Sequence, residues 1–132
     1  GVMHRKTYIN YNTLLNNGYQ LIKNENLFFA GQMTGVEWYV ESASSGMIAG
    51  INMARYLRGK PNLPLDSTTA TGALVNYISY HEEITPPETF EPMNVNFGIF
   101  AELPSKTYKK ERKRAYANRA LESIKQLINQ ME

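Results

Sequence analysis

The fold class depends on residues 27–37, which read Leu27-Phe28-Phe29-Ala30-Gly31-Gln32-Met33-Thr34-Gly35-Val36-Glu37. The four apolar residues 27–30 have the length and character of a β-strand buried on both faces, as in a parallel sheet. A glycine-bounded loop follows, and apolar residues then recur at helical spacing from Val40 to Ala54. We therefore predict a strand, a tight loop and a helix, which is the repeating unit of α/β folds.

The predicted helix has a clear end and an unusual second face. Gly59-Lys60-Pro61 should end it, because glycine suits the position after the last turn and proline cannot continue a helix. Ser42, Gly46 and Gly50 form a stripe of small residues at four-residue spacing. Each glycine costs about 1 kcal/mol of helix propensity relative to alanine. We expect close approach of this stripe to a sheet to offset that cost.

The remaining segments alternate between turns, short extended pieces and helices. The sequence predicts a turn at 16–18 and a short strand at 19–22. A second helix has an apolar face from 70 to 78, with an N-cap expected within 66–68. Alternating apolar residues predict an extended segment at 93–99. The last helix is expected from about Ser105, with an apolar face made of Ala117, Leu121, Ile124, Leu127, Ile128 and Met131.

Composition excludes several kinds of site. The 132 residues carry a net charge of +2 and contain no cysteine, so a disulfide scaffold, a thiolate zinc site and a cysteine nucleophile are excluded within this chain. The two histidines, His4 and His81, are too few to suggest a metal site. No apolar run approaches the roughly 20 residues of a membrane helix, so we expect a cytoplasmic protein. The first residues contain no start signal, and we expect the chain to be cut from a longer one.

The loop between the predicted strand and helix favours a ligand with an electron-rich edge. N–H groups at a helix start lack intrahelical partners, and the helix dipole adds positive potential there. Phosphate, carboxylate or a carbonyl on a cofactor ring suits such a position. Gly31 and Gly35 would let the backbone pass close to a flat ligand. The alternative is a simple tight turn, since the spacing is not that of the Gly-x-Gly-x-x-Gly pyrophosphate fingerprint.

Residues 27–37, followed by 39–43 and Gly46, resemble the TrmFO family, the folate- and FAD-dependent tRNA (uracil-5-)-methyltransferases related to the GidA/MnmG flavoproteins. The loop residues 33–37 fit TrmFO better than GidA. The resemblance extends over nearly the whole chain. Further segments that fit the family pattern in the same order are Gly1-Val2-Met3-His4-Arg5, Thr7, Gly50-Ile51-Asn52, Thr69-Ala70, Gly72-Ala73-Leu74, Pro92-Met93-Asn94 and Asn96-Phe97-Gly98.

This resemblance implies an enzyme that methylates C5 of a uridine in the tRNA T-loop, using FAD, 5,10-methylenetetrahydrofolate and NAD(P)H. It implies an α/β fold in which residues 1–61 are the returning C-terminal portion of a Rossmann-like FAD-binding domain. Residues 62–132 would form a helical C-terminal region packed on that portion. The family's nucleophilic cysteine and dinucleotide fingerprint lie in its N-terminal part, so no catalytic residue is expected here. We expect the isolated chain to be inactive.

The resemblance also assigns site residues. Trp38 departs from it, because the family commonly has glycine at that position; the indole must either point to solvent or reshape the pocket. His4 and Arg5 are expected at the folate, although a structural role for either residue is the alternative. Tyr39 is expected to stack on or cover the flavin, unless it only packs at the helix start. The expected FAD-binding residues are Gly31, Gln32, Met33, Thr34, Gly35, Val36 and Tyr39.

A basic cluster at the start of the last helix predicts contact with tRNA. Cations are disfavoured at a helix N-terminus, so a nearby phosphate backbone would explain their position. Tyr108 and Tyr116 lie among them in the sequence. The alternative is a solvated helix face. The cluster consists of Lys106, Lys109, Lys110, Arg112, Lys113 and Arg114.

Two other functions remain open at this stage. One is a GidA-like flavoprotein that modifies the wobble uridine of tRNA, which the upstream sequence would distinguish. The other is a cofactor-free helical module that binds RNA or a protein. If truncation exposes the edge of a sheet, self-association of the chain is also expected.

Overall fold

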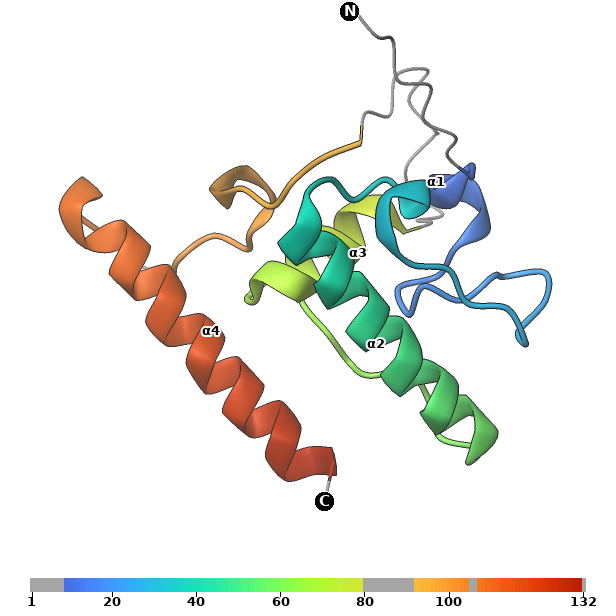
Figure 1. Ribbon diagram of the computed structural model, residues 1–132. Coiled ribbons are helices and arrows are strands. Elements are labelled where there is room, and N and C mark those ends of the chain that lie inside the picture. Colours follow the sequence, from blue (N-terminus) through green and yellow to red (C-terminus); the bar gives the residue numbers. More distant parts are fainter. Residues whose placement is uncertain (1–8, 80–91, 105–106, 132) are drawn as a thin grey trace, which may run out of the picture.

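The computed structural model describes residues 9–79, 92–104 and 107–131. The described chain is mainly helical, and Figure 1 shows the long helix α4 to one side of the α2–α3 pair, with α1 on the other side. Short 3₁₀ turns, labelled η, connect the helices. The elements in order are α1 (Tyr11–Leu14), η1 (Gly31–Thr34), α2 (Tyr39–Leu57), α3 (Ala70–Ile78), η2 (Phe97–Ile99) and α4 (Lys109–Met131).

The described chain forms no strand at 19–22 or at 27–30, so both of these predictions are wrong. Backbone pairing there is limited to isolated antiparallel bridges, one of which joins Gln20 to Phe28. Leu27 is 45% exposed, which rules out burial on both faces in this structure. A strand inside a parallel sheet has neighbouring strands along both of its edges, and the described residues place only Gln20 opposite Phe28. The apolar run therefore remains an irregular extended segment.

Helix α2 ends where the sequence predicts. Gly59 adopts the left-handed conformation with φ +67°, and the N–H of Lys60 donates to the carbonyl of Arg55 at 2.9 Å. The small-residue stripe behaves differently from the prediction. Gly46 and Gly50 are exposed, and apart from the adjacent residues and the backbone of α2 itself, no described atom lies within 4 Å of a Cβ placed at either position. No sheet of the described chain approaches this face.

The hydrophobic core gathers side chains from α1, α2, α3 and the segments between them. It crosses the predicted boundary at 61/62, because α2 and the segment 63–65 contribute to the same cluster. Tyr19 is almost fully buried, and burial raises the pKa of its phenol well above the ordinary value. The buried members are Tyr11, Leu15, Tyr19, Val36, Ile48, Ala49, Leu63, Leu65, Leu74, Val75 and Ile78.

One buried polar side chain, Asn52 of α2, joins three segments of this core. Its Nδ2 donates to the carbonyl of Gly18 at 3.2 Å, and its Oδ1 accepts from the N–H of Leu63 at 2.8 Å. Asn52 has no exposed surface. The predicted turn at 16–18 is confirmed, because the N–H of Gly18 donates to the Asn16 side chain at 2.8 Å. Asn52 thus fixes both this turn and the linker after α2 against the helix.

Helix α3 forms as predicted, but its N-cap lies one residue later than expected. The hydroxyl of Thr69 accepts from the N–H of Gly72 at 3.0 Å, which is a typical capping contact. A Cβ at Gly72 would lie 1.9 Å from the carbonyl oxygen of Asp66. The start of α3 therefore requires glycine at position 72 because of the backbone that packs against it.

The predicted extended segment at 93–99 is only partly correct. Met93 is extended and pairs in parallel with Val36. Residues Phe97–Ile99 instead form the 3₁₀ turn η2, where the Asn96 side chain accepts from the N–H of Gly98 at 2.8 Å. This local hydrogen bond competes with extended pairing.

Helix α4 begins at Lys109 rather than near Ser105, and its predicted apolar face is largely exposed. Leu121 and Ile128 are 63% and 52% exposed. Of the predicted face, Leu127 packs against the core, and the other contacts of the helix come from side chains outside that face. Tyr116 stacks on Phe97, Arg119 donates to the carbonyls of Ala101 and Glu102, and Ser123 accepts from Thr68.

We predict that Asn52→Ala lowers the free energy of unfolding by about 2–4 kcal/mol, because it leaves the Gly18 carbonyl and the Leu63 N–H buried without partners. Urea unfolding of the 132-residue chain measures this. Met53→Ala, at the next and partly exposed position of α2, is the matched control and should cost much less. Equal effects of the two substitutions would contradict the role given to Asn52.

Candidate functional site

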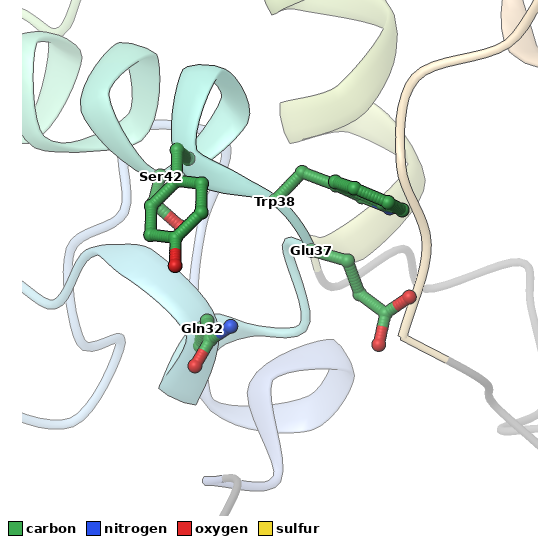
Figure 2. Close-up of a pocket in the computed structure, with 5 residues that line it drawn as sticks. Gln32, Glu37, Trp38 and Ser42 are labelled. Carbon is green, nitrogen blue, oxygen red and sulfur yellow. The ribbon is translucent and has the colours of Figure 1, made fainter.

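A pocket of about 640 Å³ lies between η1 and the start of α2. Figure 2 shows Gln32 on η1, Ser42 on α2, and Glu37 and Trp38 on the connection between them. Tyr39 also lines the pocket. Gln32 and Tyr39 are among the residues expected to bind FAD, so the structure brings two of the expected residues to one pocket.

The loop on one side of this pocket is fixed by a buried serine of α2. The hydroxyl of Ser45 accepts from the N–H of Gly31 at 2.8 Å and donates to the carbonyl of Ser42 at 2.8 Å. Ser45 has no exposed surface. The N–H of Gly31 is therefore already paired within the chain. The pattern of the sequence contained no signal for this contact, because it joins positions 14 residues apart.

Gly35 is required by packing inside the chain. Its φ is +86°, and a Cβ there would lie 2.3 Å from the ring of Tyr11. Thr34 and Val36 on either side have no exposed surface, whereas Gln32 is exposed and Met33 is 41% exposed. Contact of Gly31, Met33, Thr34, Gly35 and Val36 with a cofactor stays a prediction.

A distant segment closes the other side of the loop. The N–H of Met93 donates to the carbonyl of Gly35 at 2.9 Å, and the N–H of Glu37 donates to the carbonyl of Met93 at 3.1 Å. The carboxylate of Glu41 accepts from the N–H of Val95 at 3.3 Å. These bonds hold the peptides that lead into α2, so the pocket has a preformed wall. Reasoning from local pattern alone did not place 93–95 at this site.

Trp38 has the most unusual backbone at the pocket. Its φ of +68° and ψ of 162° lie in a region occupied almost only by glycine, and such a conformation costs about 1–3 kcal/mol. The side chain is 63% exposed and also lines the pocket. The two alternatives posed by the sequence are therefore both realised, since the indole faces solvent and shapes the pocket.

The groups around the pocket are suited to binding a polar, flat molecule. Helix α2 is 19 residues long and has no side-chain cap at its N-terminus, where the dipole favours electron-rich atoms. The lining supplies the amide of Gln32, the hydroxyl of Ser42, the carboxylate of Glu37 and the aromatic rings of Trp38 and Tyr39. The described residues contain no cluster of three or more His, Cys, Asp or Glu side chains that could hold a metal.

The other predicted site residues lie elsewhere. His4, Arg5 and Lys106 fall outside the described residues. The remaining members of the basic cluster are exposed in the first turns of α4 and follow Tyr108, which is 83% exposed. They are Lys109, Lys110, Arg112, Lys113 and Arg114.

Known proteins match the chain along almost its whole length. Residues 1–61 match the family described as glucose inhibited division protein A. The methylenetetrahydrofolate–tRNA-(uracil-5-)-methyltransferase TrmFO of Bacillus cytotoxicus is 55% identical over 130 residues, 98% of this chain. TrmFO of Bacillus cereus strain G9842 is 54% identical over the same share. The resemblance to TrmFO is confirmed.

The chain spans 29% of the length of these TrmFO relatives. Because the matched region makes up 98% of this chain, it includes η1, the pocket and α2. No helix in the described part of the chain is both long and apolar enough to cross a membrane.

We predict that Ser45→Ala loosens η1, because the N–H of Gly31 loses its acceptor inside the chain. The free energy of unfolding should fall by about 1–2 kcal/mol, and hydrogen exchange at the Gly31 amide should accelerate. Ser44→Ala is the matched control, because the Ser44 hydroxyl pairs with Thr71 instead. Unchanged protection of Gly31 in the Ser45→Ala variant would show that the serine does not hold the loop.

Proposed function

We propose that this chain is the C-terminal part of a TrmFO-type enzyme that methylates C5 of a uridine in the tRNA T-loop. Its co-substrates would be 5,10-methylenetetrahydrofolate and NAD(P)H, and its cofactor FAD. The observation that carries this proposal is the 55% identity to a protein named for this methyl transfer, extending across 98% of the chain. The cytoplasm, where tRNA is available, is the proposed compartment.

The pocket at η1 and α2 is the proposed position of the flavin ring. Its volume of about 640 Å³ lies within the range of small-molecule sites. The uncapped start of α2 would stabilise negative charge on a ring carbonyl, and Gln32 and Ser42 would orient the ring edge. When bound and reduced, FAD would supply the two electrons that turn a transferred methylene into a methyl group.

The rest of the same polypeptide would cover the outer face of α2. Four apolar or aromatic side chains of this helix are largely exposed: Tyr39 (91%), Val40 (78%), Met47 (59%) and Leu57 (79%). Gly46 and Gly50 have no side chain that would keep another layer at a distance. Such a face favours close packing against another layer. We propose that this layer is the sheet of the N-terminal Rossmann-like part. That part would also supply the cysteine nucleophile.

The basic cluster of α4 is the proposed contact with tRNA. Five exposed cations in the first turns of a helix oppose the helix dipole. Phosphates would neutralise them and release counterions. Tyr108 adds an exposed ring beside the cluster. A purely solvated face is the competing explanation.

We predict that the full-length protein containing this chain forms 5-methyluridine in the T-loop of unmodified tRNA when methylenetetrahydrofolate, FAD and NAD(P)H are supplied. Mass spectrometry of digested tRNA measures the product, and omission of the folate is the control. The isolated 132 residues should form none. Modification of the wobble uridine instead would identify a GidA-like activity, which the match of residues 1–61 keeps as the second candidate, and would overturn the proposal.

We predict that replacing Lys109, Lys110, Lys113 and Arg114 with Ala in that protein weakens tRNA binding by about tenfold or more and flattens its salt dependence. Filter binding at several salt concentrations measures both effects. The control removes three exposed cations outside α4, with Lys23, Arg58 and Lys60 changed to Ala. If both variants bind tRNA with the wild-type affinity and salt slope, α4 is a solvated face.

A further inference from the structure

We propose that Trp38 is a specificity-determining residue of the pocket, where its indole stacks on a flat, nitrogen-containing heteroaromatic ring of the ligand. The inference rests on the proposed function, in which this pocket takes the isoalloxazine of FAD; the pterin of folate is a second ring of the same chemical class. It goes further because it assigns recognition of the ring to the side chain of Trp38. The backbone conformation at this position is one that glycine favours.

Folding by itself does not account for a tryptophan at this position. The backbone at Trp38 has φ +68° and ψ 162°, a combination that glycine adopts freely and that a residue with a Cβ adopts at a cost. Burial of Trp38 contributes little to stability, because the residue is 63% exposed. A strained position with an exposed side chain beside a pocket therefore indicates an interaction with something that the pocket holds.

The chain holds the Trp38 backbone rigidly before any ligand arrives. The preceding N–H, of Glu37, donates to the carbonyl of Met93 at 3.1 Å, and the carbonyl of Trp38 accepts from the N–H of Ser42 at 3.1 Å. Figure 2 shows the indole and the Glu37 side chain on one side of the connection between η1 and α2, and Gln32 on the other. Fixing this backbone in advance lowers the entropy lost on binding.

The chemistry of these groups selects the class of ring. An indole face is electron-rich and stacks well on electron-poor planar systems, of which oxidised isoalloxazine and the pterin of folic acid are both examples. Such rings also carry nitrogen and carbonyl groups along their edges, which polar side chains of the pocket lining can bind. Saturated or non-planar ligands would lose the stacking contact.

The test compares wild type with Trp38→Gly and Trp38→Phe in the full-length protein freed of flavin. Calorimetric titrations with FAD and, separately, with folic acid measure the dissociation constants. Trp38→Gly should weaken binding of the ring that stacks on the indole by about 3- to 10-fold and raise Tm by about 2–4 °C, because the backbone strain is relieved. Trp38→Phe keeps an aromatic face and should retain most of the affinity.

The two probes distinguish the sources of the ring. Weaker binding of FAD alone assigns the indole to isoalloxazine, and weaker binding of folic acid alone assigns it to pterin. Leu121→Ala, equally exposed but on α4, is the control and should leave both titrations unchanged. If wild type binds a ring and Trp38→Gly binds it equally tightly, this inference fails while the proposed function stands. If wild type binds neither ring, both fail.

Discussion

The buried amide of Asn52 is the contact on which the arrangement of the chain depends. It accepts from the N–H of Leu63 and donates to the carbonyl of Gly18, so one side chain of α2 holds a turn before the helix and the linker after it. Buried backbone groups must be paired, and these two lie where neither helix nor sheet can pair them. Because both loops are held to α2, Leu63 and Leu65 can enter the same core as Tyr19.

The same helix shapes the pocket through two further polar side chains. Glu41 accepts from the N–H of Val95, and Ser45 accepts from the N–H of Gly31. With Asn52 these residues follow spacings of four and seven, so they lie along one face of α2. That face therefore positions loops through hydrogen bonds as well as through apolar packing. The pocket is the space left where η1, held by Ser45, meets the start of the helix.

Local signals in the sequence succeeded where the partner group lies nearby in the chain. The turn at 16–18, the end of α2 at Gly59 and the existence of α3 were all predicted, because each depends on contacts within a few residues. The prediction of a strand at 27–30 is wrong, because a strand needs partner strands that the described chain does not place beside it. The sequence predicts the apolar stripe of α4, but Leu121 and Ile128 in that stripe are exposed. Hydrophobic periodicity shows which side chains share a helix face, but it does not show what covers that face.

The sequence by itself determined α2, α3, the existence of α4, the glycine-bounded loop and the resemblance to TrmFO, because propensity, capping and motif order are properties of the chain read along its length. Only the tertiary structure decided that Gly35 is required by the ring of Tyr11 and that Met93 closes the loop. It also decided that Trp38 stands in a glycine conformation at the edge of a pocket. These facts depend on groups far apart in sequence, whose meeting follows from the packing of the whole core.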